Sequence, residues 1–288
     1  MKWSEFSSAR AACAYFFILS GLTYGQLTAR MPALKMQTGA NEEEVGYALL
    51  CLGIASLITL AVSDRLIARW GSSSILRISS LLLMISLPLF GMASSPAHLI
   101  LCAILAGFCM GLVDVAINTQ GIQVEHQYRR PCMSLMHASY SCGGLLGSLT
   151  GSLFAGEGLS VLANFLSIML VYACLRPLAV PRLQHDILAS SGGQKEHTKG
   201  IPVFVLVCGI LAMLTYSAEG SIADWGSLLL FTSKGASEHT AALVFGAYSG
   251  ATALCRLFGD RLRIRMGDTP LMVGGAMLAA CSMLAVLL

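Results

Sequence analysis

A stripe of polar and small residues follows one face of an apolar segment centred near Cys109. Its members are three or four residues apart, the spacing of one α-helical face: Gly107, Gly111, Asp114, Asn118, Gly121 and Glu125. An ionisable side chain inside a membrane-spanning helix costs roughly 3 kcal/mol on insertion scales, so Asp114 should face a partner or a water-filled cavity. The stripe predicts a carboxylate that carries protons or binds a solute. The alternative is a structural hydrogen bond to a neighbouring helix.

A second polar stripe lies in the next apolar segment, centred near Leu146. It consists of His137, Ser141, Gly144 and Ser148. Beside it runs a track of Gly143, Gly147 and Gly151, a small-xxx-small pattern that favours close packing of two helices. We expect His137 to face the helix that carries Asp114. A lone histidine at such a place can equally be a structural residue with all its hydrogen bonds satisfied.

The tripeptide Leu-Thr-Tyr occurs twice, ending at Tyr24 and at Tyr216, and each copy is followed by polar residues. The first copy is followed by Gln26 and Arg30, and the second by Glu219 and Asp224. We expect these residues to join the first two stripes around a polar cavity, with Glu219 as its second carboxylate. The alternative is that Arg30 and Asp224 only mark the outer interface of the membrane. The predicted solute and proton pathway comprises Tyr24, Gln26, Arg30, Asp114, Asn118, His137, Tyr216, Glu219 and Asp224.

The elements that position these residues are predicted to be membrane-spanning helices. Hydrophobic residues make up 56% of the chain and charged residues only 11%, too few to cover a soluble globule. Crossing about 30 Å of hydrocarbon takes about 20 helical residues, and open strands would leave unpaired backbone groups in lipid. We therefore predict an all-α polytopic bundle with nine spans. They are centred near Leu19, Ile54, Leu83, Cys109, Leu146, Ile168, Ile210, Gly246 and Met277.

The distribution of basic residues predicts the orientation of the bundle. If the N-terminus is cytoplasmic, 15 of the 18 Lys and Arg residues lie inside and only Arg30, Lys35 and Lys234 lie outside. Cytoplasmic loops of membrane proteins carry such an excess of positive charge. The sequence thus predicts a multi-pass protein of a bacterial inner membrane with its N-terminus in the cytoplasm.

One polar stretch divides the predicted spans into two groups. Residues 177–200 include Pro181 and a Ser-Ser-Gly-Gly run, a composition that favours a linker. We predict a six-helix bundle over residues 1–176, a cytoplasmic linker over 177–200 and a partial bundle of three helices over 201–288. Three spans after the linker, against six before it, predict either a C-terminally truncated copy of a twelve-helix protein or an incomplete reading frame.

A repeated octapeptide relates the two groups of spans. Residues 64–71 and 260–267 share the pattern Asp-Arg-x-x-x-Arg-x-Gly, and each follows one apolar run and precedes another. The pattern resembles the loop signature that the major facilitator superfamily of secondary transporters carries in both halves. The resemblance implies a gating latch at these two charged loops, whose arginines could alternatively serve topology alone. The residues in question are Asp64, Arg65, Arg69, Asp260, Arg261 and Arg265.

Three further segments narrow the resemblance. Residues 111–121, 137–141 and 219–225 are similar to those of the MosC-like and YbjJ-like inner-membrane permeases of that superfamily. The resemblance implies secondary active transport by alternating access. By analogy it also implies a small polar solute, sugar-like or cyclitol-like. We expect Asp114 or Glu219 to couple its transport to protons, and we expect symport. A truncated remnant that transports nothing is the alternative function.

Other classes of function find little support in the sequence. No metal-ligand spacing, no Ser-His pair at catalytic spacing and no phosphate-binding glycine loop is present, so we expect no enzyme, no metal and no cofactor. A net charge of +3 does not indicate binding to nucleic acid. The expected partners are a solute, protons and the lipid bilayer, and we expect the protein to act as a monomer.

Overall fold

The computed structural model describes residues 2–185 and 203–287, and these form helices without any strand. The first part of the chain comprises α1 (Lys2–Ala29), α2 (Met31–Thr38), α3 (Glu42–Trp70), α4 (Ser72–Gly91), α5 (Pro96–Tyr128), α6 (Met133–Gly156), α7 (Val161–Ala179) and the 3₁₀ turn η1 (Val180–Arg182). The second part comprises α8 (Val203–Gly220), the π-helical η3 (Ser221–Trp225), α9 (Gly226–Leu228), the π-helical η4 (Leu229–Ser233), α10 (Glu238–Met266) and α11 (Asp268–Leu287). The all-α prediction is confirmed.

A helix lies over each of the nine predicted spans: α1, α3, α4, α5, α6, α7, α8, α10 and α11. Within the described ranges, however, only six helical segments are both long and apolar enough to cross a membrane. Two of the exceptions, α1 and α6, pack along each other, and α6 also packs along α10. In these contacts α1 and α6 can direct polar side chains toward protein rather than lipid. The same polar side chains lower the mean hydropathy of both helices. In α11 the residues with described side chains contribute an apolar stretch over 269–285.

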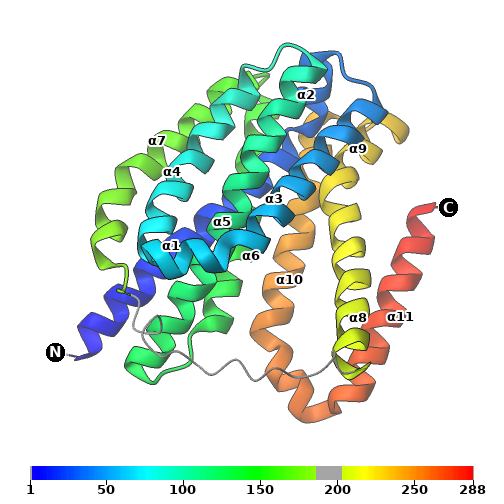
Figure 1. The fold of residues 1–288 in the computed structure, drawn as a ribbon. Coiled ribbons are helices and arrows are strands. Elements are labelled where there is room, and N and C mark those ends of the chain that lie inside the picture. The colour runs from blue at the N-terminus through cyan, green and yellow to red at the C-terminus, as the bar shows by residue number, and fades with distance from the viewer. Residues whose placement is uncertain (1, 186–202, 288) are drawn as a thin grey trace.

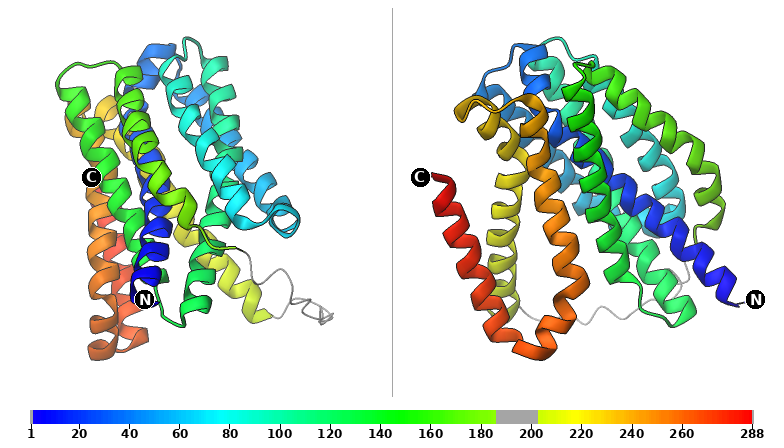
Figure 2. Two further views of the ribbon diagram at one scale, coloured as in Figure 1. Left: turned by 90° about the vertical axis from the view of Figure 1, so that its left-hand side faces the viewer. Right: turned by 180° about the vertical axis from the view of Figure 1, so that it is seen from behind.

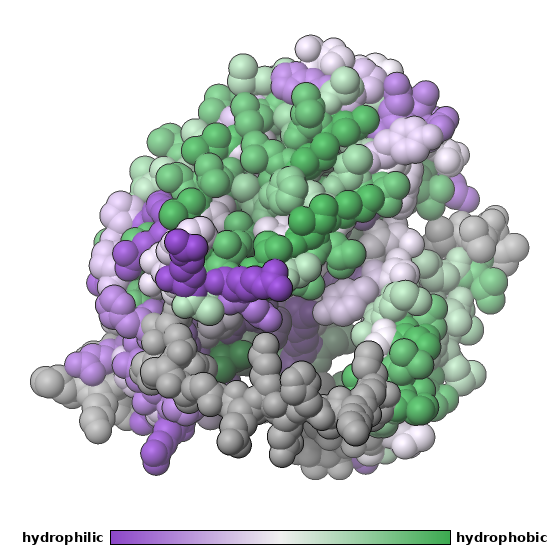
Figure 3. Space-filling model, viewed as in Figure 1, coloured by the Kyte–Doolittle hydropathy of each residue, from purple (hydrophilic) through white to green (hydrophobic). Residues whose placement is uncertain are grey.

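Consecutive long helices run in opposite directions (Figure 1). We call the end that carries the N-terminus the inner end, and Figure 2 shows the α3–α4 and α10–α11 connections at this same end. We call the opposite end, with α2 and α9, the outer end. Helices α1 to α7 form one bundle, and α10 joins the second part of the chain to it by packing along α6. Apolar side chains cover much of the outer surface between the two ends (Figure 3).

Glycines set the close contact between α1 and α6. A Cβ atom at Gly143 would lie 2.2 Å from the carbonyl oxygen of Ile18, and one at Gly21 would lie 2.0 Å from the carbonyl oxygen of Tyr140. A Cβ at Gly147 would likewise lie 2.5 Å from the carbonyl oxygen of Leu22. Side chains do not fit at these distances, so the predicted small-residue track does bring two backbones together.

Glycines also set the close contact between α3 and α5. A Cβ at Gly107 would lie 2.2 Å from the carbonyl oxygen of Leu52, and one at Gly111 would lie 2.7 Å from that of Ser56. The small members of the first predicted stripe thus pack against α3. Its polar members, Asp114 and Asn118, lie one to two turns farther along α5.

The two repeated octapeptides are not loops, which corrects the sequence prediction. Residues 64–70 form the end of α3 and residues 260–266 the end of α10, and each helix is followed directly by the next. The connection in each case is one glycine with positive φ, +79° at Gly71 and +82° at Gly267, a conformation that other residues rarely adopt. A one-residue turn of this kind needs no loop, so the charged residues stay helical.

The predicted linker begins later than expected. Helix α7 continues through Pro177 to Ala179, and η1 extends the helical path to Arg182. Of the predicted linker, residues 186–200 lie outside the described part of the chain.

Candidate functional site

A polar cavity of about 520 Å³ lies between the first bundle and the second part of the chain. Six helices contribute to its wall: α1, α3, α5, α6, α8 and α10. Its volume falls in the range of small-molecule sites. It is lined by Phe17, Ser20, Tyr24, Ser56, Met110, Asp114, Ile117, Asn118, His137, Tyr140, Tyr216, Glu219 and Arg256.

The first wall of the cavity brings together the predicted stripes of α5 and α6. Asn118 donates from Nδ2 to the backbone carbonyl of Asp114 at 2.9 Å and to its carboxylate Oδ1 at 3.3 Å. The side chains of Asp114 and His137 are both exposed to the cavity. The ring of Phe17 on α1 meets that of His137 edge-on, with 5.6 Å between centroids. Asp114 and His137 thus share one wall of the cavity.

The second wall comes from α8 and α10, with Tyr216, Glu219 and Arg256. Arg256 crosses to the first bundle, where its Nη1 donates to the carbonyl oxygen of His137 at 2.9 Å and to Ser141 Oγ at 2.7 Å. From the sequence, Arg256 is predicted only to be one of the inner basic residues. Its position in an apolar run, one turn before the Asp260 octapeptide, hid its place in the cavity wall.

A hydrogen bond between the two parts of the chain borders the cavity toward the outer end. Tyr24 donates its hydroxyl proton to Oδ1 of Asp224 at 2.6 Å. Asp224 lies in η3, where the wider π-helical turn shifts the side-chain register relative to α8. Such irregular turns are often found at functional sites. Asp224 therefore contacts the predicted pathway through Tyr24 rather than lining the cavity.

Two predicted pathway residues lie away from the cavity. Gln26 is buried and donates to the hydroxyl of Thr150 on α6. Arg30 is also buried at the outer end, where Nη1 lies 3.2 Å from Oε1 of Glu238 and Nη2 donates to the carbonyl oxygen of Leu159 at 2.8 Å. Both residues hold helices together, and Arg30 does so across the two parts of the chain.

The polar stripe predicted on α6 continues outward as a seam with α10. The hydroxyl of Ser148 donates to the carbonyl oxygen of Ala242 and accepts from the amide of Gly246 at 2.9 Å. One turn farther, Ser152 Oγ lies 2.9 Å from Nδ1 of His239. Nothing in the sequence pairs α6 with α10, because spacing within one helix reveals a face but not the helix that covers it.

The predicted latch residues lie at the inner end. Asp64, Arg65 and Arg69 are exposed at the end of α3, and the guanidinium of Arg69 lies 5.5 Å from the ring centroid of its neighbour Trp70. Arg265 is exposed at the end of α10, whereas the side chains of Asp260 and Arg261 are outside the described part of the structure. Among the side chains that the structure describes, Arg30 and Glu238 form an ion pair between the two parts, at the opposite end.

Comparison with known proteins gives a consistent set of relatives. The sequence profile of the Major Facilitator Superfamily matches residues 11–288. An uncharacterised MFS-type transporter of Yersinia pestis is 30% identical over 92% of this chain and 68% of its own length. The membrane protein MosC of Rhizobium meliloti is 25% identical over 94% of this chain and 66% of its own length.

Solved structures show the same fold. Crystal structures of the nucleoside transporter NupG superpose with TM-scores of 0.65 and 0.63, at 15% and 16% identity. They cover 90% and 94% of this chain, and the chain covers 69% and 68% of theirs. At such low identity the likeness concerns the arrangement of helices and not the solute. The chain spans about two thirds of the length of each of these relatives.

Proposed function

Because this chain belongs to the Major Facilitator Superfamily and is a multi-pass membrane transporter rather than an enzyme, we propose that it moves a sugar-like or cyclitol-like solute in symport with protons. The solute binds in the cavity between the two parts of the chain, and these parts rock against each other to expose it to one side of the membrane at a time. One chain supplies both walls, which supports action as a monomer.

The observation that carries the proposal is the chemistry of the cavity wall. Hydroxyl-rich rings need several donors and acceptors at once, and Asn118, Tyr216 and Glu219 supply them from both parts of the chain. Phe17 adds an aromatic ring of the kind that packs against the apolar face of a sugar. Arg256 provides a further set of donors directed from α10.

Two of the polar contacts between the two parts support a state closed toward the outer end. Tyr24–Asp224 and Arg30–Glu238 lie outward of Asp114 and His137 along their helices. If the protein lies in a bacterial inner membrane with its N-terminus in the cytoplasm, the outer end faces away from the cytoplasm. The solute then enters or leaves through the inner end, where the octapeptide residues from Asp64 to Arg69 and from Asp260 to Arg265 form the latch of the opposite state.

Asp114 is the proposed proton carrier. Its carboxylate is exposed to the cavity in this state. When the cavity closes and water leaves it, the ionised form of the carboxylate rises in free energy relative to the protonated form. Closure with bound solute therefore favours uptake of a proton. Glu219 lies near the hydroxyls of Tyr24, Tyr140 and Tyr248 and serves as the second carboxylate of the site.

An uptake screen tests the proposal. The purified chain is reconstituted into liposomes with an imposed pH gradient and offered sugars, cyclitols and amino sugars, with nucleosides as a comparison class. We expect at least one ring polyol to accumulate against its gradient, and a protonophore to abolish this accumulation. A correctly inserted chain that accumulates no compound would instead favour the non-transporting remnant.

A further inference from the structure

A second site lies on the opposite side of α1 from the transport cavity, in the groove between α1 and α7. Two cavities of about 480 and 390 Å³ adjoin there and share Ala11, Tyr15 and Leu175 in their walls. Together they follow α1 from Ser8 to Leu22, a length of about 21 Å at 1.5 Å per helical residue. This exceeds half of the roughly 30 Å hydrocarbon thickness of a bilayer.

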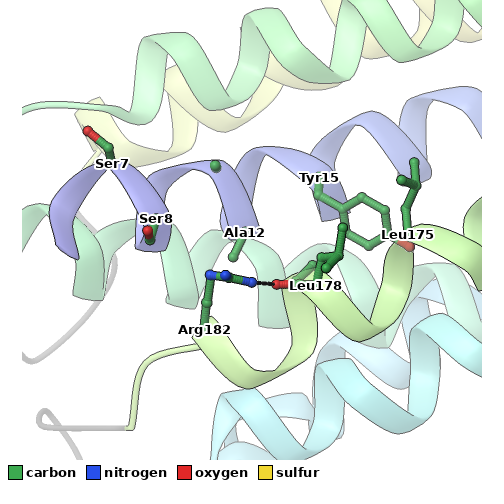
Figure 4. Close-up of a pocket in the computed structure, with 9 residues that line it drawn as sticks. Ser7, Ser8, Ala12, Tyr15, Leu175, Leu178 and Arg182 are labelled. Atoms are coloured by element: carbon green, nitrogen blue, oxygen red, sulfur yellow. Dashed lines mark hydrogen bonds between the residues drawn. The ribbon is translucent and has the colours of Figure 1, made fainter. Parts of the chain in front are cut away.

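The groove changes character along its length. At the inner end it is lined by Ser7, Ser8 and Arg182 (Figure 4). Toward the middle of the bundle its lining becomes apolar, with Ile18, Leu22, Ile168 and Val171. The order from polar end to apolar stem is that of an amphiphile lying along the helices.

Tyr15 makes the floor of the groove rigid. Its ring stacks on that of Tyr172 with 4.9 Å between centroids and an interplanar angle of 16°. Its hydroxyl donates to the carbonyl oxygen of Tyr172 at 2.9 Å. Small side chains at Ala11 and Ala12 keep the slot open beside it. The groove is thus a preformed feature of the α1–α7 contact.

Arg182 supplies the charge at the mouth. It extends from η1 toward α1, lies beside Ala12 and donates to the carbonyl oxygen of Leu178 (Figure 4). In the described part of the chain this carbonyl is its only hydrogen-bond acceptor, which leaves further N–H donors of the guanidinium fork for a ligand. A basic pocket between spans at the cytoplasmic side is suited to a phosphate headgroup.

The polar inner end and the apolar stem of the groove match the headgroup and the acyl chain of a membrane lipid. We propose that the groove binds one anionic glycerophospholipid of the inner-end leaflet, with its phosphate on Arg182 and one acyl chain between α1 and α7. This site does not depend on the identity of the transported solute.

Native mass spectrometry of the delipidated chain tests the site, with dioleoylphosphatidylglycerol and dioleoylphosphatidylcholine as probes. We expect the anionic lipid to be retained about fivefold better, the value of one basic residue near the headgroup. Arg182→Gln should remove this preference. Ala11→Trp should fill the slot and reduce retention of both lipids.

Two matched variants serve as controls. Arg129→Gln removes an exposed arginine at the inner end of α5, and Cys174→Trp adds the same bulk to an exposed position of α7 outside the groove lining. Both should bind lipid as the unmodified chain does. Equal retention of the two lipids would overturn the proposal, and so would unchanged adducts in Ala11→Trp. Displacement by glycerol phosphate alone would also overturn it, because the acyl chain would then contribute nothing.

Discussion

Asp114→Asn is expected to abolish accumulation of the solute against its gradient, a loss of at least a hundredfold in the proton-driven rate. The amide has the shape of the carboxyl group and can still bond to Asn118, but it cannot take up and release a proton. The variant should therefore still exchange solute across the membrane when no net work is required. Uphill uptake and solute counterflow in the same liposomes separate these two activities.

The matched control is Glu157→Gln, which removes an exposed carboxylate at the outer end of α6, away from the cavity. It should accumulate solute as the unmodified chain does. Asp114→Glu keeps the ionisable group and should retain part of the uphill rate. Normal accumulation by Asp114→Asn would exclude Asp114 from the coupling step, whatever the solute.

Glu238→Ala should destabilise the chain by about 3–5 kcal/mol, because it leaves Arg30 buried without its partner. The side chain of Arg30 is 2% exposed and that of Glu238 is 21% exposed, so water can replace little of the lost interaction. Denaturant unfolding in detergent measures the change in free energy. Because this pair joins the two parts of the chain, we expect the variant also to open more readily toward the outer end.

The chain contains its own control for this prediction. Lys35 pairs with Glu42, whose side chain is 65% exposed, and an exposed pair is worth at most about 1 kcal/mol. Lys35→Ala should therefore change stability little. Replacing both members of the buried pair, as Arg30→Met with Glu238→Leu, should recover much of the loss, since apolar groups need no counter-charge. Similar small effects in Glu238→Ala and Lys35→Ala would contradict the role of the buried pair.

The part of the site that could be predicted from the sequence consists of polar residues inside apolar, membrane-spanning segments. Asp114, Asn118 and His137 stand out because polar side chains at helical spacing need a reason to interrupt apolar runs, and all three line the cavity. Glycine spacing likewise predicted the close packing of α6, which the approach of Gly143 to Ile18 confirms.

The remaining features depend on contacts between distant segments. Gln26 in α1 bonds to Thr150, and Arg30, which directly follows α1, pairs with Glu238; no spacing within this segment could reveal these partners. In the sequence Arg256 looks like one more basic residue of the inner end. Nothing in the sequence indicates that α10 packs along α6 and places Arg256 in the cavity wall. The charged octapeptides suggested loops because charged residues between two apolar runs are expected both in a loop and at a helix end. The sequence does not show that one glycine, such as Gly71, makes the whole turn.

Binding of the solute between the two parts of the chain is tested most directly by equilibrium titration of the purified protein with the solute found in the uptake screen. Asn118→Ala changes the first wall and Tyr216→Phe the second, while Ser217→Ala alters a hydroxyl that donates to the carbonyl oxygen of Met213 within α8 and is not part of the cavity lining. We expect each wall variant to weaken binding about tenfold, the value of one or two lost hydrogen bonds, and Ser217→Ala to bind normally. Undiminished affinity in both wall variants would place the solute outside this cavity.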